Sequence, residues 1–198
     1  VREGLMGFLD SILGRTKPPE ADLGALFAVP QAALSLSVEG FAATGVGGVC
    51  YRPAEGGAFN DTETQIKQLI ATGGGPTIEG TTDQFGFRWL TVTRTDADVS
   101  GLVTDLHGIN ASLADAGFGS ALLCSTVIFT TPAAEASPSR PMALVYLYKR
   151  GTFYPFAPLT DERRDNPLEL QVRGLVASDV TVEPDLSRWL AIWGAPGL

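Results

Sequence analysis

His107 is the only histidine in the chain, so a Ser-His-Asp site would have to use it. Asp105 stands two residues before it, in a segment whose apolar residues have helical spacing. Side chains at i and i+2 of a helix point in different directions, so Asp105 cannot orient His107 for catalysis. The sequence also contains no Gly-x-Ser-x-Gly motif that would present a nucleophile. We therefore expect His107 to lie on a helix surface or to make a structural hydrogen bond.

Residues that bind metals are present, but they do not have metal-ligand spacing. One histidine and two distant cysteines form neither Cys-x-x-Cys nor His-x-x-x-His. An all-carboxylate site from Asp96, Asp98 and Asp105 is an alternative, but negative charge is also favoured at the start of a helix. We expect no metal and no other cofactor.

The two cysteines, Cys50 and Cys124, each lie inside an apolar run typical of a strand. Free cysteines are commonly buried and behave as small apolar residues, so we expect two buried thiols. One long-range disulfide is the alternative.

Two glycine runs could suggest a phosphate-binding loop. Such a loop must open a helix, because the helix N-terminus holds the phosphate. The run at 45–48 precedes a predicted strand, and the run at 73–75 follows a predicted helix. Both runs are typical of turns, and the sequence predicts no nucleotide site.

The most distinctive stretch, residues 144–171, combines aromatic and basic side chains, the types that anchor protein interfaces. Alternate residues of a strand face the core, so about half of them should be exposed; we expect Lys149, the 153–156 turn and two loop arginines. The predicted interaction surface comprises Lys149, Arg150, Phe153, Tyr154, Phe156, Arg163 and Arg164.

Two alternatives use the same stretch or the same apolar surface. A small-molecule pocket, or an unfamiliar active site, could lie beneath the 151–166 loop and use Tyr154, Arg164 and Asp165. An apolar face could instead be a homodimer contact. The acidic residues Asp161 and Glu162 lie among arginines, where ion pairing explains them, so we expect a protein that is not an enzyme.

Composition narrows the class of partner. The net charge is −8, and phosphate backbones are bound mainly by Lys and Arg, so nucleic acid is excluded. Charged residues make up 18% of the chain, below the roughly 25% of soluble domains. This indicates either apolar surface that a partner covers or a compact domain rich in Gly and Ala.

The N-terminal residues predict a short amphipathic helix with Phe8, Leu9, Ile12 and Leu13 on one face. Pro18-Pro19 separates it from the remainder, which predicts a helix and linker over 1–17 and a single α+β domain over 18–198. The apolar face could lie on an anionic membrane or dock on the body of the protein. No apolar run reaches about 18 residues, so we expect a cytoplasmic protein with peripheral contact at the inner face of the membrane as an option.

From residue 20 onward, a helix followed by two strands occurs three times. The fold class is therefore α+β, with a largely antiparallel sheet of five or six strands and helices packed on one face. Terminal helices or another protein must then cover the other face. The expected helices are 20–28, 60–72, 99–116, 166–177 (capped by Asn166) and a short one from Asp185, and the expected strands are 33–39, 45–52, 77–83, 86–94, 121–131 and 142–150.

Several strings resemble the actinobacterial and archaeal PspA-associated family PspAB. They are Met6-Gly-Phe-Leu-Asp, Gly101-Leu-Val-Thr-Asp-Leu-His, Tyr148-Lys-Arg-Gly-Thr-Phe-Tyr-Pro-Phe, Arg164-Asp-Asn-Pro-Leu-Glu-Leu-Gln and Trp193-Gly-Ala-Pro-Gly-Leu. The resemblance implies a non-enzymatic accessory protein of the envelope (phage-shock) stress response. It also implies a PspA-type protein or an HtpX-like membrane protease as partner, and it supplies no catalytic residues.

Overall fold

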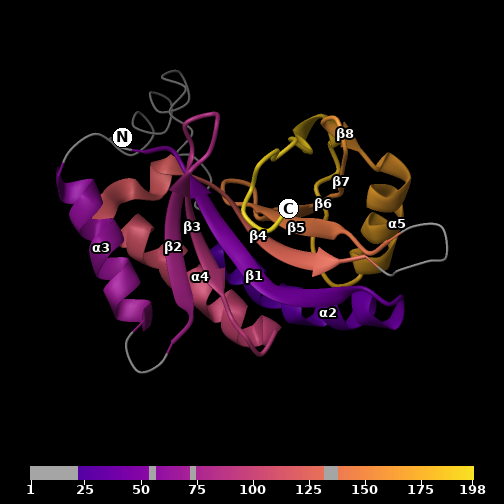
Figure 1. The fold of residues 1–198 in the computed structure, drawn as a ribbon, viewed down its shortest axis with the longest axis horizontal. Coiled ribbons are helices and arrows are strands. Elements are labelled where there is room, and N and C mark those ends of the chain that lie inside the picture. The colour runs from indigo at the N-terminus through magenta and orange to yellow at the C-terminus, as the bar shows by residue number, and fades with distance from the viewer. Residues whose placement is uncertain (1–21, 54–56, 72–74, 132–137) are drawn as a thin grey trace, which may run out of the picture.

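The computed structural model describes residues 22–53, 57–71, 75–131 and 138–198. A six-stranded sheet in the order β2-β3-β1-β4-β5-β6, with every neighbouring pair antiparallel, forms the centre (Figure 1). Its strands are β1 Ala42–Tyr51, β2 Thr77–Thr82, β3 Arg88–Thr93, β4 Leu122–Thr130, β5 Pro141–Leu147 and β6 Thr152–Phe156. A separate small hairpin joins β7 Pro158–Leu159 to β8 Arg163–Arg164. The α+β prediction is confirmed.

The helices cover one face of this sheet, with α3 beside β2, α4 behind the central strands and α5 toward β6 (Figure 1). They are the 3-10 helix η1 Leu23–Ala28, α2 Val29–Val38, α3 Gly57–Ala71, α4 Val99–Leu113 and α5 Asn166–Val176. Leu102, Leu106 and Leu113 of α4 are at most 1% exposed. These leucines are four and seven residues apart, so they lie on one side of the helix. That side packs against the sheet.

The opposite face is covered by the C-terminal segment, residues 181–198, which includes a single 3-10 turn, η4 Leu186–Arg188. The segment first bridges β6 in parallel, through Phe153 and Val182, and then crosses in front of the sheet (Figure 1). A second apolar cluster lies beneath it and comprises Cys50, Trp89, Cys124, Ile128, Ala143, Val145, Tyr154, Phe156, Trp189 and Ala195. The sheet therefore has a core on each face.

Two predicted elements were wrong, and one strand was missed. Residues 33–39 were predicted as a strand, but 33–38 form the second half of α2 and Glu39 is its C-cap. The helix forms because Pro30 suits the first helical turn and Val29, Ala32 and Leu36 fall on one buried stripe. The strand β6 was not expected. The helix predicted from Asp185 is the three-residue turn η4, where the Asp185 side chain accepts a hydrogen bond from the Ser187 amide.

The described part of the first helix, Leu23–Ala28, is 3-10 rather than α. Helix α5 was predicted with Asn166 as its cap, but Asp165 occupies that position and accepts a hydrogen bond from the Leu168 amide at 3.1 Å. The predicted N-terminal helix with Phe8, Leu9, Ile12 and Leu13 lies outside the described residues. Within the described ranges, no helix has the length and apolar character needed to span a bilayer.

Candidate functional site: the C-terminal face

The aromatic residues of the predicted interaction surface are buried, so the expected exposed turn at 153–156 was wrong. Phe153, Tyr154 and Phe156 are 1%, 1% and 0% exposed. The reason is that both faces of β6 are covered: Phe153 joins the helix-side core, while Tyr154 and Phe156 join the core beneath the C-terminal segment. Neither side of the strand faces solvent.

The basic residues of that surface divide into two groups. Arg150 pairs with Glu183 at 2.7 Å, and Arg164 is held between the Glu169 carboxylate and the Phe156 ring. Lys149 and Arg163 are exposed and form no ion pair within the described ranges.

Glu183 anchors the start of the C-terminal segment, although it is fully buried. Its carboxylate accepts hydrogen bonds from Arg150 and from the Thr152 hydroxyl, both at 2.7 Å. Burial alone would raise the pKa of Glu183, but the hydrogen bonds from Thr152 and Arg150 outweigh it and lower that pKa. The buried charge is thus compensated, and it fixes the segment to β6.

Further contacts hold the middle of the segment on the sheet. The Trp189 indole donates to the Glu183 carbonyl at 3.0 Å, and the Tyr154 hydroxyl donates to the Leu190 carbonyl at 2.8 Å. Arg164 donates to the Trp189 carbonyl, and the Trp189 ring stacks on Tyr154 with the centroids 6.0 Å apart. The segment is therefore an integral part of this face.

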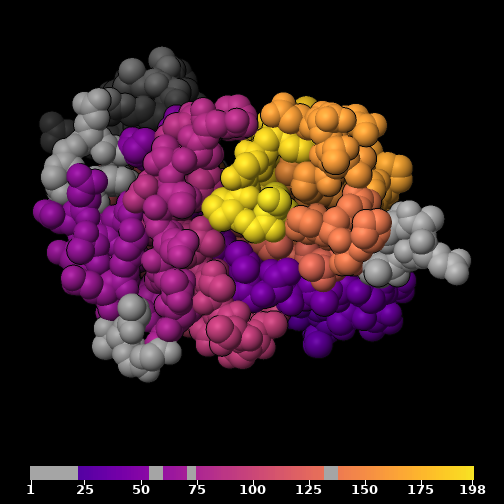
Figure 2. Space-filling model, in the orientation of Figure 1, coloured from indigo at the N-terminus to yellow at the C-terminus, as the bar shows by residue number. Residues whose placement is uncertain are grey.

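Two hollows flank this anchored segment. The first, here the Phe85 hollow, lies between the turn of the β2–β3 hairpin and residues 190–193, and Figure 2 shows it between the magenta hairpin and the yellow segment. Its volume is about 250 Å³, and Phe85, Phe87, Leu123, Leu147, Ile192 and Trp193 supply much of its apolar lining. The second, here the Arg164 hollow, has a volume of about 340 Å³ and is lined by Arg164, Asn166, Glu169, Leu170, Leu186 and Trp189.

Large apolar side chains stand exposed at both hollows. Phe85 and Leu190 border the first and are 57% and 62% exposed, and Leu170 and Leu186 border the second and are 51% and 53% exposed. We call this surface, with its two hollows, the C-terminal face. Clustered apolar side chains of this size typically mark an interaction site.

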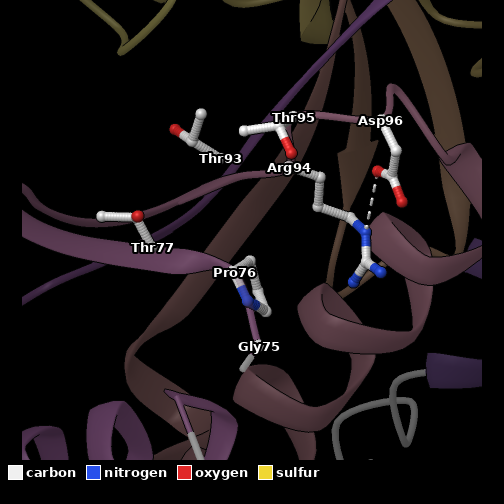
Figure 3. Close-up of a pocket in the computed structure, with 7 residues that line it drawn as sticks. All are labelled: Gly75, Pro76, Thr77, Thr93, Arg94, Thr95 and Asp96. Atoms are coloured by element: carbon white, nitrogen blue, oxygen red, sulfur yellow. Dashed lines mark ion pairs between the residues drawn. The ribbon is translucent and has the colours of Figure 1, made fainter. Parts of the chain in front are cut away.

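A third hollow, of about 170 Å³, is polar and lies at the ends of β2 and β3 (Figure 3). Its one cation, Arg94, bonds Asp105 at 2.7 Å and lies 3.5 Å from Asp96 and 3.8 Å from Asp98. The three carboxylates once considered as metal ligands thus surround a guanidinium. Arg94 balances only one of these three negative charges, and because it is already ion-paired, the described lining of the hollow offers no free cation for an anion.

The other chemical candidates are also committed to structural contacts. His107 lies with Nδ1 3.3 Å from the Leu23 carbonyl oxygen and packs against Phe27, while Asp105 bonds Arg94. Cys50 and Cys124 are buried and free, as expected.

The alternative pocket beneath the 151–166 loop is not assembled from its three predicted residues. Tyr154 lines the Phe85 hollow, whereas Arg164 lines the other one. Asp165 caps α5 and pairs with Arg140. The three side chains therefore do not converge on one ligand.

A family model described as PspAB, PspA associated protein B, matches residues 6–197. The chain belongs to the PspAB family. The family name implies association with PspA in a phage-shock context, and it assigns no role to any residue. Searches of curated proteins and of solved structures found no match for this PspAB chain.

The exposed apolar residues of the C-terminal face were missed as a site by sequence reasoning. The sequence predicted only a short helix from Asp185, which carries Leu186, Trp189, Leu190 and Trp193. A usable signal was that the sheet needed a cover on its second face, and this segment is the last apolar stretch available to supply it.

Proposed function

We propose that this PspAB protein is a non-enzymatic accessory protein that binds a protein partner of the envelope stress response through its C-terminal face. The observation that carries the proposal is the group of four exposed apolar side chains, Phe85, Leu170, Leu186 and Leu190, around a firmly anchored segment. A PspA-type protein is the proposed partner, and the family name supports this choice.

The chemistry of the face favours a protein over a small metabolite. Two of the polar side chains that line its hollows are already paired, since Arg164 bonds Glu169 and the Tyr154 hydroxyl bonds a backbone carbonyl. A metabolite site needs a few free polar groups that fix the orientation of the ligand. A protein interface instead has an apolar centre and a polar rim.

Two of the predicted basic residues fit the rim of such an interface. Lys149 lies in the turn between β5 and β6, and Arg163 lies on β8, one residue from the side chain that lines the Arg164 hollow. Both are exposed, so they are available for acidic groups of a partner. Rim charges mainly influence association rate and salt dependence.

The test compares two leucines of equal exposure on opposite faces. Leu190 on the C-terminal face and Leu34 on α2 are both 62% exposed. We expect Leu190→Ser to weaken binding of a purified PspA-type protein at least about tenfold, which corresponds to about 1.4 kcal/mol, and Leu34→Ser to leave it unchanged.

Binding would be measured by biolayer interferometry with the full chain immobilised, and circular dichroism would check that each variant folds. Equal binding by both variants and the unaltered chain would rule out the C-terminal face. Binding to an HtpX-like protease in place of the PspA-type protein would retain the face and change the partner. Lys149→Glu and Arg163→Glu test the rim and should change the salt dependence more than the dissociation rate.

A further inference from the structure

We infer that Cys50 and Cys124 form an intrachain disulfide when the protein is equilibrated with a disulfide oxidant such as oxidised glutathione. This thiol pair is a modification site at the base of the Phe85 hollow, and its oxidation requires no protein partner. The sequence left a long-range disulfide open as an alternative, and the structure shows why these two cysteines could form it.

The first support is the register of the sheet. Cys50 of β1 and Cys124 of β4 are direct partners in an antiparallel pair. Directly opposed residues in such a pair have Cα atoms about 4.5–5.5 Å apart, within the range of about 4.4–6.8 Å that a disulfide requires. Both side chains point to the same face, since both belong to the cluster beneath the C-terminal segment.

The second support is that the two thiols are near neighbours. Cys124 raises the pKa of Cys50, as only a nearby side chain can, and both cysteines line the same hollow. Loss of the two thiol protons and formation of the S–S bond therefore involve side chains that already lie together on one face of the sheet.

The third support is access. Both cysteines line the Phe85 hollow, although they are only 4% and 7% exposed. A small oxidant can approach through the hollow, while a second protein chain cannot bring its own cysteine to either sulfur. The geometry therefore favours a bond within the chain over one between chains.

Burial and the neighbouring thiol slow this reaction without changing its end point. The hydrogen bond to Cys124 and burial raise the pKa of Cys50, and the Asp83 carboxylate, which lines the same hollow, acts in the same direction. Since the thiolate is the reactive form, oxidation of the folded protein is slow near neutral pH. The site thus differs from a fast peroxide sensor, in which a lowered thiol pKa is required.

The reaction is a two-step thiol–disulfide exchange. One thiolate attacks oxidised glutathione, which forms a mixed disulfide and releases one glutathione thiolate. The second cysteine then attacks the protein sulfur of the mixed disulfide and releases the second glutathione. Two protein thiols lose two protons and two electrons, and one glutathione disulfide becomes two glutathione thiols.

The experiment equilibrates the full chain in glutathione buffers of graded oxidised-to-reduced ratio. Equilibrium is approached from the folded reduced protein and by refolding from denaturant, because the folded thiols react slowly. Intact mass, thiol titration after denaturation and peptide mapping are the readouts. We expect a monomer that has lost two hydrogen atoms and both titratable thiols, with a peptide link between Cys50 and Cys124.

Cys50→Ser and Cys124→Ser serve as matched controls and should each retain one thiol or a single glutathione adduct. Two thiols persisting in the most oxidising buffer from both directions would overturn the inference. So would glutathione adducts on the unaltered chain without an internal link, or disulfides only between chains. Partner binding is not a readout here, so failure of the proposed function would leave this result intact.

Discussion

At the scale of single residues, Glu63 has a strongly lowered pKa and a well-defined set of partners within the described part of the chain. It is 7% exposed and accepts hydrogen bonds from Arg88 at 2.5 and 3.0 Å and from Lys67 at 2.7 Å. Burial would raise the pKa of Glu63, but the bonds from Arg88 and Lys67 outweigh it and lower the pKa to about 2. The cluster ties α3 to the strand β3.

This arrangement predicts a defined loss of stability in acid. Because the folded pKa of Glu63 is depressed from 4.5 to about 2, its stabilisation is present above pH 4.5 and is lost as the pH falls toward 2. Allowing for solvent screening, we expect Glu63→Gln to lower the free energy of unfolding by about 2 kcal/mol at pH 7 and much less at pH 2.

Urea unfolding at pH 7, 4, 3 and 2 measures this prediction. Glu79→Gln is the control, because Glu79 is an exposed carboxylate on the neighbouring strand β2. An equal loss for Glu63→Gln at every pH would contradict the assignment of the pH dependence to this carboxylate.

Substitution by alanine should change the free energy of unfolding in opposite directions at Gly47 of β1 and at Gly108 of α4. A Cβ at Gly47 of β1 would lie 2.7 Å from the Thr126 carbonyl oxygen and 3.0 Å from Leu106 Cδ1, whereas one at Gly108 of α4 would meet nothing within 4 Å. We expect Gly47→Ala to destabilise the fold by about 2 kcal/mol through overpacking. Gly108→Ala should stabilise it by about 1 kcal/mol, since alanine is the better helix former.

Chemical denaturation at neutral pH compares the two variants with the unaltered chain. A neutral Gly47→Ala would show that β1 and α4 can move apart at little cost. It would also show that close packing does not require glycine at position 47 of β1.

At the scale of elements, periodicity predicted the segments that pack on one side only. The stripe of Leu102, Leu106 and Leu113 identified α4, and Asn110 completes its buried side with a hydrogen bond to Ser125 at 2.9 Å. Strand β6 was missed because every residue in it is buried, so it lacks the alternation that marks a half-exposed strand. Helix α2 was missed because Pro30 suggested a break where it in fact belongs to the first turn.

The C-terminal segment is predicted to depend on the buried Glu183 more than on its neighbour Asp185. Asp185 is exposed and caps the short turn η4 through Ser187, whereas Glu183 bonds Arg150 and Thr152 of the sheet end. We expect Glu183→Ala to release the segment and Asp185→Ala to fray only the turn.

Tryptophan fluorescence reports the difference, because the chain's three tryptophans, Trp89, Trp189 and Trp193, all belong to or pack against the cluster beneath this segment. Glu183→Ala should shift the emission to longer wavelength and raise acrylamide quenching at least about twofold, because the indoles move from a buried to a hydrated environment. Matching quenching for the two variants would place the anchor elsewhere in the segment.

At the scale of the whole molecule, the candidate site depends on segments that are remote in sequence. The turn at residues 83–87, the start of β4 and residues 190–193 meet only because β1 lies between β3 and β4 in the sheet. Local patterns carry no information on that order. The sequence therefore predicted the α+β class and the need for a cover, while the hollows and their exposed rims required the strand order.

The same arrangement predicts that the two cores unfold together. Neighbouring residues of the shared strands serve opposite cores, as Val49 and Cys50 of β1 do, so neither core can be lost without disrupting the strands that carry the other. Leu106 is fully buried on the helix side, and Leu106→Ala should cost about 2–5 kcal/mol. Urea unfolding followed by far-UV circular dichroism reports the helices, and tryptophan fluorescence reports the opposite face. We expect both midpoints to fall by the same amount and to coincide, as in a two-state transition. A fluorescence midpoint left unchanged while the dichroism midpoint falls would show that the C-terminal face is an independent cooperative unit, which the shared strands argue against.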